Sequence, residues 1–429
     1  MPRTALPNTI PWILQKGIKH EQSVFEVFEP RKSFSLAEDT ELCVCEKVTP
    51  EAYDAYLGYL GSLSSLKESA SNTVGSLRAR TYRISGGGIL HVTHNAGDGR
   101  LRILHDPLGG VLRDLPPQGA AISHKICQPV LSVMPLNFSQ QNPIDCNGMG
   151  FVLLLEDGSF LIWDGGYAID AERLYAYLWK SSPFPDHRIV ISAWILTHSH
   201  GDHCGCFNAF TRLFAEQVTV RCFLLNPPVA GEGVIGQRAC DSFLTETFPA
   251  LLSRYPNARA VRVHAGQRAI FSGAEIEILQ TYEDVLPMQM DYLNEASVVT
   301  RLKLGGQTVL FCADCEMKGD NQLILLGDAL KSDFLQVSHH AYSGGSPELW
   351  DAVDPEYLFW TTSYETLFPR LLPSWRHGLY TGLLTRDGIK GTWACDGWIK
   401  EFPMPLGSAK EVRYKTCPDI ADVEREENQ

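Results

Sequence analysis

No apolar run in this sequence reaches the length of about 18 to 20 residues that a membrane-spanning helix needs. The N-terminus has one basic residue, Arg3, before Pro7 and Pro11 interrupt it, so it lacks the continuous apolar stretch of a secretory signal. Internal repeats and low-complexity tracts are also lacking. These absences argue against an integral membrane protein and against a solenoid. We therefore expect a cytoplasmic protein with no membrane partner.

Cationic side chains are in deficit, because 37 Lys and Arg residues stand against 50 Asp and Glu residues, a net charge of -13. This balance argues against non-specific binding of nucleic acid through a basic surface. A nucleotide-type substrate stays open, because a metal centre supplies its own positive charge. With 44% hydrophobic and 20% charged residues, the chain can bury a sizeable core, and 429 residues suffice for two domains.

The 12 cysteines do not fall into the compact framework of a small disulfide-rich secreted protein. Cys43 and Cys45 lie in an apolar strand-like run, where a reduced cysteine behaves as a small hydrophobe. Cys204, Cys206 and the pair Cys312 and Cys315 receive the same structural interpretation, with redox sensitivity as the alternative.

Composition divides the chain into two main parts. Residues 1–23 have no clear period and predict an irregular arm, and residues 24–115 predict a small α+β module. The Pro-rich residues 116–128 predict a linker. Residues 129–405 predict a larger domain, and the Asp- and Glu-rich residues 406–429 predict a solvated acidic tail.

The small module has clear local signals. Thr49 followed by Pro50 predicts a helix start. Residues 77–84, 89–93 and 101–104 predict strands separated by glycine-containing turns. The role of this module stays open between substrate binding, dimerisation and capping of an active site.

The larger part alternates strand-like and helix-like segments. Residues 151–155, 160–163 and 189–196 read as buried strands, and residues 171–179 have helical spacing. Such alternation predicts layers of helices on sheets.

The chemistry is concentrated in residues 197–203 (THSHGDH), which directly follow an apolar strand. His198, His200, Asp202 and His203 place three imidazoles and a carboxylate within six positions, and these groups are ligands for zinc and similar divalent ions. A single histidine is more often a core or surface residue, but several at one strand end bury poorly without partners. The cluster therefore predicts a metal site.

The spacing of this cluster resembles the HxHxDH signature of the metallo-β-lactamase superfamily. Three further positions resemble the family's motifs in the same order: Asp164 in LIWDGG, Asp314 in VLFCAD and His339 in LQVSHH. The resemblance implies an α+β fold, the four-layered αββα metallo-β-lactamase arrangement, preceded here by the small α+β module.

The resemblance also implies two metal positions that share one bridging carboxylate. The ligands would be His198, His200 and Asp314 for the first, and Asp202, His203, Asp314 and His339 for the second. Asp164 would orient the metal loop. Many relatives have a further His near residues 278–282, which hold none here, and His264 precedes a turn and is not expected to replace it. The first position is therefore expected to be weak or open to solvent.

One branch of the superfamily resembles this chain in more detail: the soluble hydrolase domain of bacterial competence (DNA-uptake) channel proteins and their free-standing relatives. The resemblance lies in residues 294–299 (NEASVV), in the pair His339 and His340 followed by small residues, and in residues 380–388. Transport is not implied, because the membrane helices of those channels have no counterpart here. The branch implies a phosphodiester-type substrate.

The expected cofactor is Zn²⁺, as one or two ions, with Mn²⁺ as an alternative. Oxygen-reducing di-iron relatives resemble HxExDH and have a carboxylate at the position of His200. The additional nitrogen ligand here favours a zinc hydrolase over a di-iron redox enzyme. A metal-activated water would attack the substrate. Asp202 could both ligate and accept a proton, and His340 could stabilise charge or protonate the leaving group, unless it is only a partner of a ligand or an exposed residue. Residues 342–346 read more simply as a glycine-rich loop than as an oxyanion site.

Two other functions stay open. A carboxylic ester, lactone or thioester hydrolase would use the same centre. A non-catalytic regulatory protein could hold a metal for stability, although a closed structural zinc site needs only four ligands, fewer than are present here. Expected partners are a small-molecule or nucleotide-type substrate, and a homodimer stays open.

Overall fold

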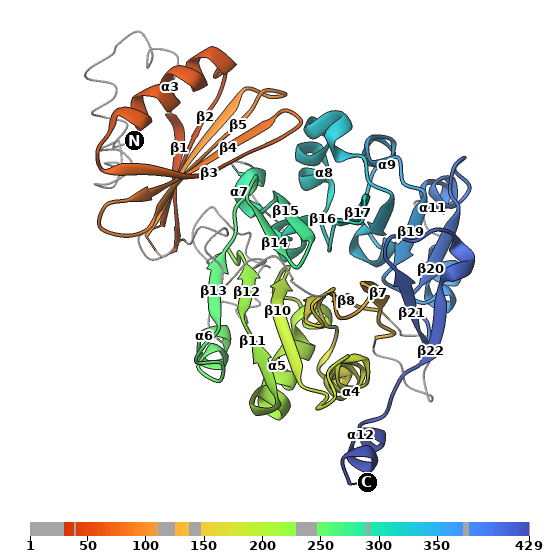
Figure 1. Cartoon of the computed structure of the whole chain (residues 1–429). Helices are drawn as coiled ribbons and strands as arrows, with labels where there is room; N and C mark the ends of the chain where they lie inside the picture. The colour runs from red at the N-terminus through yellow and green to blue at the C-terminus, as the bar shows by residue number, and fades with distance from the viewer. Residues whose placement is uncertain are drawn as a thin grey trace.

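The computed structural model of the chain describes residues 30–37, 40–107, 109, 125–136, 147–228, 247–286, 288, 290, 292–371 and 377–428 (Figure 1). The irregular arm expected at residues 1–23 lies outside these residues, and so does most of the linker expected at 116–128. The described strands form three sheets, one in the N-terminal module and two in the rest of the chain.

The N-terminal module consists of an antiparallel sheet in the order β1-β2-β6-β5-β4-β3 and one helix. Its elements are β1 (Pro30–Ala37), β2 (Thr40–Cys45), α3 (Pro50–Ser62), β3 (Leu66–Val74), β4 (Leu77–Ile84), β5 (Ile89–Asn95) and β6 (Arg100–Asp106). Helix α3 begins where the sequence predicts, because Thr49 Oγ1 accepts a hydrogen bond from the amide of Ala52 (3.2 Å). Tyr53, Tyr56 and Leu60 of α3 are buried in the core that it forms with the sheet.

The three strands predicted in this module are confirmed as β4, β5 and β6. Strand β3 was not predicted, because its sequence LKESASNTV has few apolar residues and no regular alternation. It forms by pairing with β4 at the edge of the sheet, an interaction between strands that single-strand periodicity does not report.

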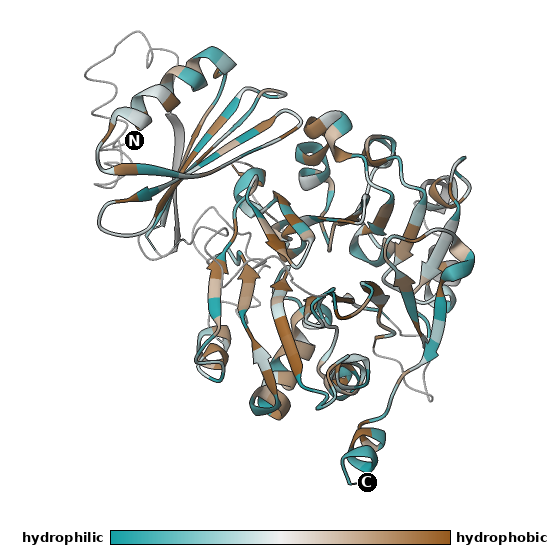
Figure 2. Cartoon of the chain, viewed as in Figure 1, coloured by the Kyte–Doolittle hydropathy of each residue, from teal (hydrophilic) through white to brown (hydrophobic). Residues whose placement is uncertain are grey.

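The second sheet runs in the order β13-β12-β10-β9-β8-β7-β21-β22, with β11 paired to β10. Its strands are β7 (Val130–Val133), β8 (Gly150–Leu154), β9 (Phe160–Asp164), β10 (Ile189–Leu196), β11 (Val218–Val220), β12 (Cys222–Leu225), β13 (Arg259–Arg262), β21 (Trp398–Pro403) and β22 (Arg413–Thr416). Strand β10 is parallel to both β9 and β12, with Ile195 opposite Trp163. Figure 2 shows β10 and β12 as largely hydrophobic, as expected for strands that are covered on both faces.

The third sheet runs in the order β14-β15-β16-β17-β18-β19-β20. Its strands are β14 (Arg268–Phe271), β15 (Ala274–Gln280), β16 (Val299–Leu304), β17 (Gln307–Phe311), β18 (Phe334–Val337), β19 (Tyr357–Trp360) and β20 (Gly391–Ala394). The sheet is antiparallel from β14 to β17 and parallel from β17 to β20.

The second and third sheets face each other across an aromatic core. Phe151 and Trp163 of one sheet pack against Phe311 of the other, and the rings of Trp163 and Phe311 stack with centroids 4.4 Å apart. Separate buried clusters join the outer face of each sheet to helices. The helices on the second sheet are α4 (Ala171–Ser181), α5 (Gly201–Phe214), α6 (Phe248–Leu252) and α12 (Ile420–Glu427), and those on the third are α8 (Met317–Leu323), α9 (Pro347–Val353), α10 (Tyr364–Leu371) and α11 (His377–Leu384). The expected α+β fold with four αββα layers is confirmed.

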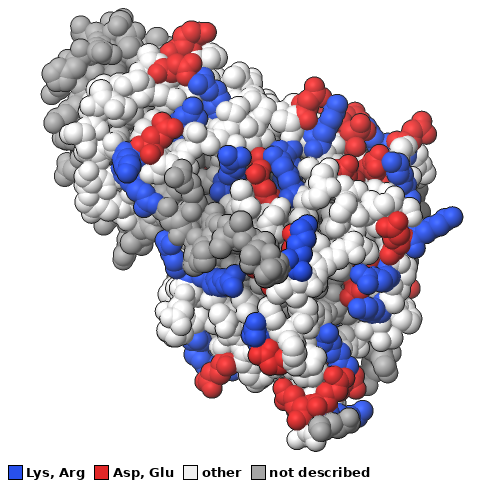
Figure 3. Space-filling model, viewed as in Figure 1, with Lys and Arg blue, Asp and Glu red and all other residues white. Residues whose placement is uncertain are grey.

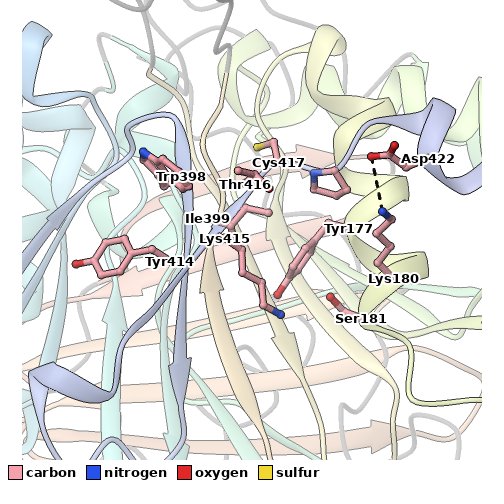
Figure 4. Close-up of a pocket in the computed structure, with 11 residues that line it drawn as sticks. Tyr177, Lys180, Ser181, Trp398, Ile399, Tyr414, Lys415, Thr416, Cys417 and Asp422 are labelled. Carbon is pink, nitrogen blue, oxygen red and sulfur yellow. Dashed lines mark ion pairs between the residues drawn. The ribbon is translucent and has the colours of Figure 1, made fainter.

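The C-terminal residues differ from the expected solvated tail at 406–429. Strand β22 extends the second sheet, and α12 packs on α4 with Val423 only 2% exposed. Lys180 of α4 makes ion pairs with Asp422 (3.7 Å) and Glu426 (3.6 Å) of α12, and Figure 4 shows the first of these beside a pocket of about 480 Å³. This helix was not predicted from the sequence, because Asp and Glu residues surround the few apolar residues that it buries.

Among the described residues, no helix is both long enough and apolar enough to cross a membrane.

Candidate metal centre

The HxHxDH motif lies at the junction of β10 and α5. Strand β10 ends at Leu196, and His200 is the N-cap of α5, so His198 lies in the loop while Asp202 and His203 occupy the first helical turn. His200 has extended backbone and ends the loop. The loop and the first helical turn therefore direct the four side chains toward a common centre. Asp202 also lies at the positive end of the helix dipole, which favours its ionised form.

Asp164 fixes this loop from beneath. It ends β9 beside β10, is fully buried, and its carboxylate accepts hydrogen bonds from the amide (2.8 Å) and hydroxyl (2.7 Å) of Thr197. The same carboxylate lies 2.7 Å from Nδ1 of His203. Nδ1 of His203 is therefore the protonated nitrogen, and Nε2 is directed away from Asp164 toward the centre of the cluster.

The third sheet supplies the opposing side chains. Asp314 follows β17, and His339 and His340 follow β18, whose pairing with β17 is parallel, so both segments leave the sheet at the same edge. Ala313, His339 and His340 all have positive φ (50°, 47° and 51°). Such backbone is unfavourable for residues other than glycine and is frequent at functional sites.

One group of four donors consists of Asp202, His203, Asp314 and His340, with one ligand atom of each residue within 4.8 Å of the others. Nε2 of His340 lies 3.0 Å from Asp202 Oδ2 and 3.4 Å from Asp314 Oδ2. Nε2 of His203 lies 3.1 Å from Asp314 Oδ1 and 3.3 Å from Nε2 of His340. Nδ1 of His340 donates to the carbonyl of Thr361 (2.9 Å), so both imidazoles direct Nε2 inward.

A second group consists of His198, His200 and Asp314. Nε2 of His198 lies 3.2 Å from Nδ1 of His200 and 3.7 Å from Asp314 Oδ2. Within the described residues, this group has no fourth His, Cys, Asp or Glu donor. The sequence has no middle histidine, and in the structure a group of three donors lies beside a group of four.

The donor groups differ from the expected ligand set at His339 and His340. The sequence assigned His339 to the metal and His340 to catalysis, but the donor group contains His340 and omits His339. His339, His340 and Ala341 all have left-handed backbone, and the rings of His339 and His340 lie 6.0 Å apart at an interplanar angle of 66°. The ring of His339 contacts Glu316 (3.1 Å) and Ser343, and its Nε2 lies 3.8 Å from Asp314 Oδ2.

Glu316 organises the surroundings of His339. Its Oε1 accepts hydrogen bonds from Asn294 Nδ2 (3.1 Å) and Ser343 Oγ (2.8 Å) and lies 3.1 Å from His339 Nδ1. Burial alone would raise the pKa of Glu316, but the hydrogen bonds from His339, Asn294 and Ser343 lower it to about 2. An ionised Glu316 therefore orients a histidine ring that keeps 20% of its side chain exposed.

The carboxylates of the donor groups change the pKa values of the histidines around them. Burial would lower the pKa of His340, but Asp314 and Asp202 raise it to about 10. The same balance between burial and carboxylates raises the pKa of His203 well above its usual value. Burial lowers the pKa of His198, and the neighbouring His203 lowers it further. Carboxylates that hold protons on imidazoles in this way would equally favour a divalent cation in place of those protons.

The donor set fits a metal by its chemistry. Imidazole nitrogens that face one another at 3.2 and 3.3 Å cannot both carry protons without repulsion, whereas a shared cation would accept both lone pairs. The outer nitrogens of His203 and His340 are already fixed by Asp164 and Thr361, the arrangement typical of metal-ligating histidines.

His264 lies outside both donor groups. Its Nδ1 is 2.9 Å from Glu283 and its Nε2 is 3.5 Å from Asp106, and all of its side chain is buried. The expectation that it is not a ligand thus agrees with its position. Two hydroxyls reach the three-donor group instead: Thr197 Oγ1 lies 3.2 Å from His198 Nδ1, and Ser297 Oγ lies 3.4 Å from it and accepts from the Asp314 amide (3.1 Å).

The cysteines near the centre are free thiols in the described residues. Cys204 Sγ donates to the carbonyl of His198 (2.8 Å), and burial raises the pKa of Cys312 and Cys315. Buried protonated thiols are poor nucleophiles, which agrees with a structural role.

Several residues of the centre had no assigned role at the level of sequence. Asn294 and Ser297 belong to a motif that was noted only for its resemblance, and Ser343 belongs to the segment interpreted as a glycine-rich loop. Glu316 and Thr361 carry no signal of their own. Their importance comes from contacts between segments distant in the sequence, and a single sequence does not contain these contacts.

Comparison with known proteins gives similarity in three dimensions but not in sequence. No family model and no curated protein matches this chain. Among solved structures, the metallo-β-lactamase fold protein YhfI from Bacillus subtilis is 15% identical, with a TM-score of 0.39, and the match covers 64% of this chain and 99% of YhfI.

Two further similarities are to enzymes. The diiron β-hydroxylase CmlA from Streptomyces venezuelae is 13% identical with a TM-score of 0.39, over 65% of this chain and 54% of CmlA. The short form of human tRNase Z is also 13% identical with a TM-score of 0.31, over 54% of this chain and 90% of the tRNase. Similarities this low assign neither a substrate nor a metal.

Proposed function

We propose that this chain is a metal-dependent hydrolase that acts on a phosphodiester-type substrate through a zinc centre. The ligands in this proposal are His198, His200 and Asp314 for one ion, and Asp202, His203, Asp314 and His340 for the other. The observation that carries it is the convergence of two donor groups on Asp314, where imidazole nitrogens face each other at 3.2 and 3.3 Å.

The two positions differ in what they leave for chemistry. Four protein donors can close a tetrahedral zinc site, whereas three donors leave a coordination place for water or substrate. A divalent ion at such a place would acidify a bound water and polarise a phosphoryl or carbonyl oxygen. Donors rich in nitrogen favour Zn²⁺, with Mn²⁺ as the alternative.

Two side chains of the chain would handle protons and substrate. Asp202 Oδ2 lies beside His340 at the edge of the four-donor group, where its side chain is 19% exposed, and it is placed to accept a proton as well as to ligate. His339 takes the role that the sequence suggested for His340. Its partly exposed ring, held by Glu316 and Asn294, is placed to contact the substrate's leaving oxygen.

The phosphodiester preference is supported by the resemblance of residues 294–299 and of the His339–His340 pair to the DNA-uptake branch. It requires no broad basic surface, because the ions would supply the positive charge. On the face shown in Figure 3, Lys and Arg side chains are interspersed with Asp and Glu, which agrees with a small or nucleotide-type substrate rather than long nucleic acid.

The test is hydrolysis of bis(p-nitrophenyl) phosphate by protein reconstituted with Zn²⁺ or Mn²⁺. We expect metal-dependent turnover that Asp314→Asn abolishes and that the control Asp422→Asn, on α12, retains. A panel of carboxylic esters, lactones and thioesters run in parallel would reveal the alternative hydrolase. Metal bound at stoichiometric amounts with no turnover on either panel would favour a non-catalytic regulatory protein and contradict the proposal.

A further inference from the structure

The N-terminal module packs directly on the chain segment that leads into the metal centre. Leu42, Val44 and Leu104 of its sheet form one buried cluster with residues of and after α7 (Tyr282–Val285). The cluster extends to Ala296, which lies in the short helical turn η6 (Leu293–Ala296). Figure 1 shows α7 against the N-terminal sheet.

Arg102 of β6 makes the polar part of this contact. Its guanidinium donates to the carbonyls of Glu283 (3.3 Å), Asp284 (2.6 Å) and Leu286 (3.4 Å). These carbonyls belong to the end of α7, where no further helical turn satisfies them. Arg102 itself is 4% exposed, and a guanidinium is buried in this way only when its hydrogen bonds are satisfied.

The segment that Arg102 and the cluster hold then enters the metal centre. Asn294 Nδ2 lies 3.2 Å from Nε2 of His339, and Ser297 Oγ lies 3.4 Å from Nδ1 of His198. The amide of Val298 donates to the carbonyl of Thr197 (3.1 Å), directly beside the ligand loop. The positions of His198 and His339 thus depend on a turn whose other side is covered by the N-terminal module.

A second bridge supports the same segment. Glu283 of α7 accepts from Asn226 (2.9 Å) and contacts His264, while His264 lies 3.5 Å from Asp106 of β6. Arg262 Nη1 donates to Thr40 Oγ1 (2.8 Å) across the same interface. The contacts of His264 with Asp106 and of Arg262 with Thr40 join the two parts of the chain, and Glu283 links α7 to His264.

We propose that the N-terminal module is a positioning element of the metal centre, and that Arg102 is its main positioning residue. Arg102 fixes the end of α7, and the segment from α7 to η6 sets Ser297 against His198 and Asn294 against His339. The effect on turnover rests on the proposed hydrolase function, but the effect on the segment itself does not.

The experiment compares Arg102→Met, Arg102→Lys and the control Arg301→Met in the full chain. Arg301 is a matched control because it is 6% exposed and donates to the Glu277 carboxylate and the Ala329 carbonyl, which lie outside α7 and η6. Hydrogen exchange of the backbone amides of residues 293–299 is measured first. Zn²⁺ affinity, kcat and KM on the phosphodiester follow.

In Arg102→Met, we expect exchange at residues 293–299 to accelerate about tenfold or more, because local opening no longer costs the hydrogen bonds at α7. Exchange in β4 and β5 should stay unchanged. Arg102→Lys should give an intermediate acceleration, and it is the variant to analyse if Arg102→Met does not fold. We expect kcat to fall with KM nearly constant, and Zn²⁺ affinity to fall at the three-donor position only.

Unchanged exchange at residues 293–299 in a folded Arg102 variant would overturn the proposal, and so would equal acceleration there in Arg301→Met. A wild-type protein that hydrolyses nothing would contradict the proposed function alone, because the exchange result would still decide the role of Arg102.

Discussion

Two buried histidine clusters in this protein look alike and differ in one respect. At the metal centre, His203 lies between Asp164 and Asp314, and at the module interface, His264 lies between Glu283 and Asp106. Both imidazoles are fully buried between two carboxylates. At the centre, however, Nε2 of His340 also lies 3.3 Å from Nε2 of His203, whereas at the interface His264 belongs to neither donor group.

The difference teaches what separates a metal site from a buried ion pair. Carboxylates on both sides hold a proton on a histidine, and the resulting imidazolium needs no other cation. Several imidazoles that face one another cannot all be protonated without repulsion, and a shared cation can take the place of those protons. The number of converging nitrogens, rather than burial or charge, therefore distinguishes the two clusters.

The largest expected effect comes from removing the residue shared by both donor groups. Asp314→Asn should release both ions and lower kcat/KM by about 10³-fold or more, since the metal-activated water is lost. Zinc per chain, measured by plasma mass spectrometry, should fall from two toward zero. Two zinc ions retained by this variant would show that Asp314 does not bridge them.

The neighbouring histidines offer the sharpest pair of variants. His340→Gln should lower zinc per chain from two to one, because His340 belongs to the four-donor group. His339→Gln should keep both ions and lower kcat by about 10²-fold, the usual range for a group that assists proton transfer or charge development. Loss of one zinc ion in His339→Gln, with both ions retained in His340→Gln, would show that His339 is the ligand.

A smaller effect is expected from the residue that orients the loop. Asp164→Asn should weaken zinc at the four-donor position by about 10- to 100-fold, because the hydrogen bond to His203 fixes its tautomer. Competition with a chromophoric chelator measures this affinity. The same affinity in Asp164→Asn and in wild type would mean that the loop is held without this carboxylate.

The smallest effect concerns the other cluster and depends on pH. Burial would lower the pKa of His264, but Glu283 and Asp106 raise it to about 9, above its ordinary value of 6.5. The protonated histidine therefore stabilises the fold fully below pH 6.5, and this stabilisation is lost as pH rises through 9. It amounts to about 3 kcal/mol at most.

The measurement is the difference in free energy of unfolding between wild type and His264→Gln, taken by urea denaturation in the presence of chelator. We expect the difference to shrink between pH 6.5 and 9.5. A difference that stays constant with pH would show that His264 acts through packing alone. Added zinc should stabilise both proteins equally, because His264 lies in neither donor group.

Much of the metal centre could be predicted from the sequence because its residues lie at strand ends with local signatures. The apolar run before Thr197 predicts β10. The density of His and Asp after it predicts metal ligands without any knowledge of the neighbouring strands. Asp164 and Asp314 follow strands of the same kind. Which of His339 and His340 lies in the donor group was not predictable, since both residues have left-handed backbone that the sequence does not indicate.

Other features required the assembled fold. Strand β3 forms on the edge that β4 offers, and α12 forms where Val423 meets α4. Arg102 reads in sequence as one polar residue of a strand, and only the packing of two modules reveals that it holds the end of α7. Contacts between segments distant in the sequence decide each of these cases.

The most direct test of the central claim is the anomalous diffraction of crystals grown with Zn²⁺, recorded at the zinc absorption edge. We expect two peaks, each at about 2.0 to 2.2 Å from its ligand atoms, with Asp314 between them and His340 rather than His339 as a ligand. The absence of zinc between these residues, or a zinc held by His339, would contradict it.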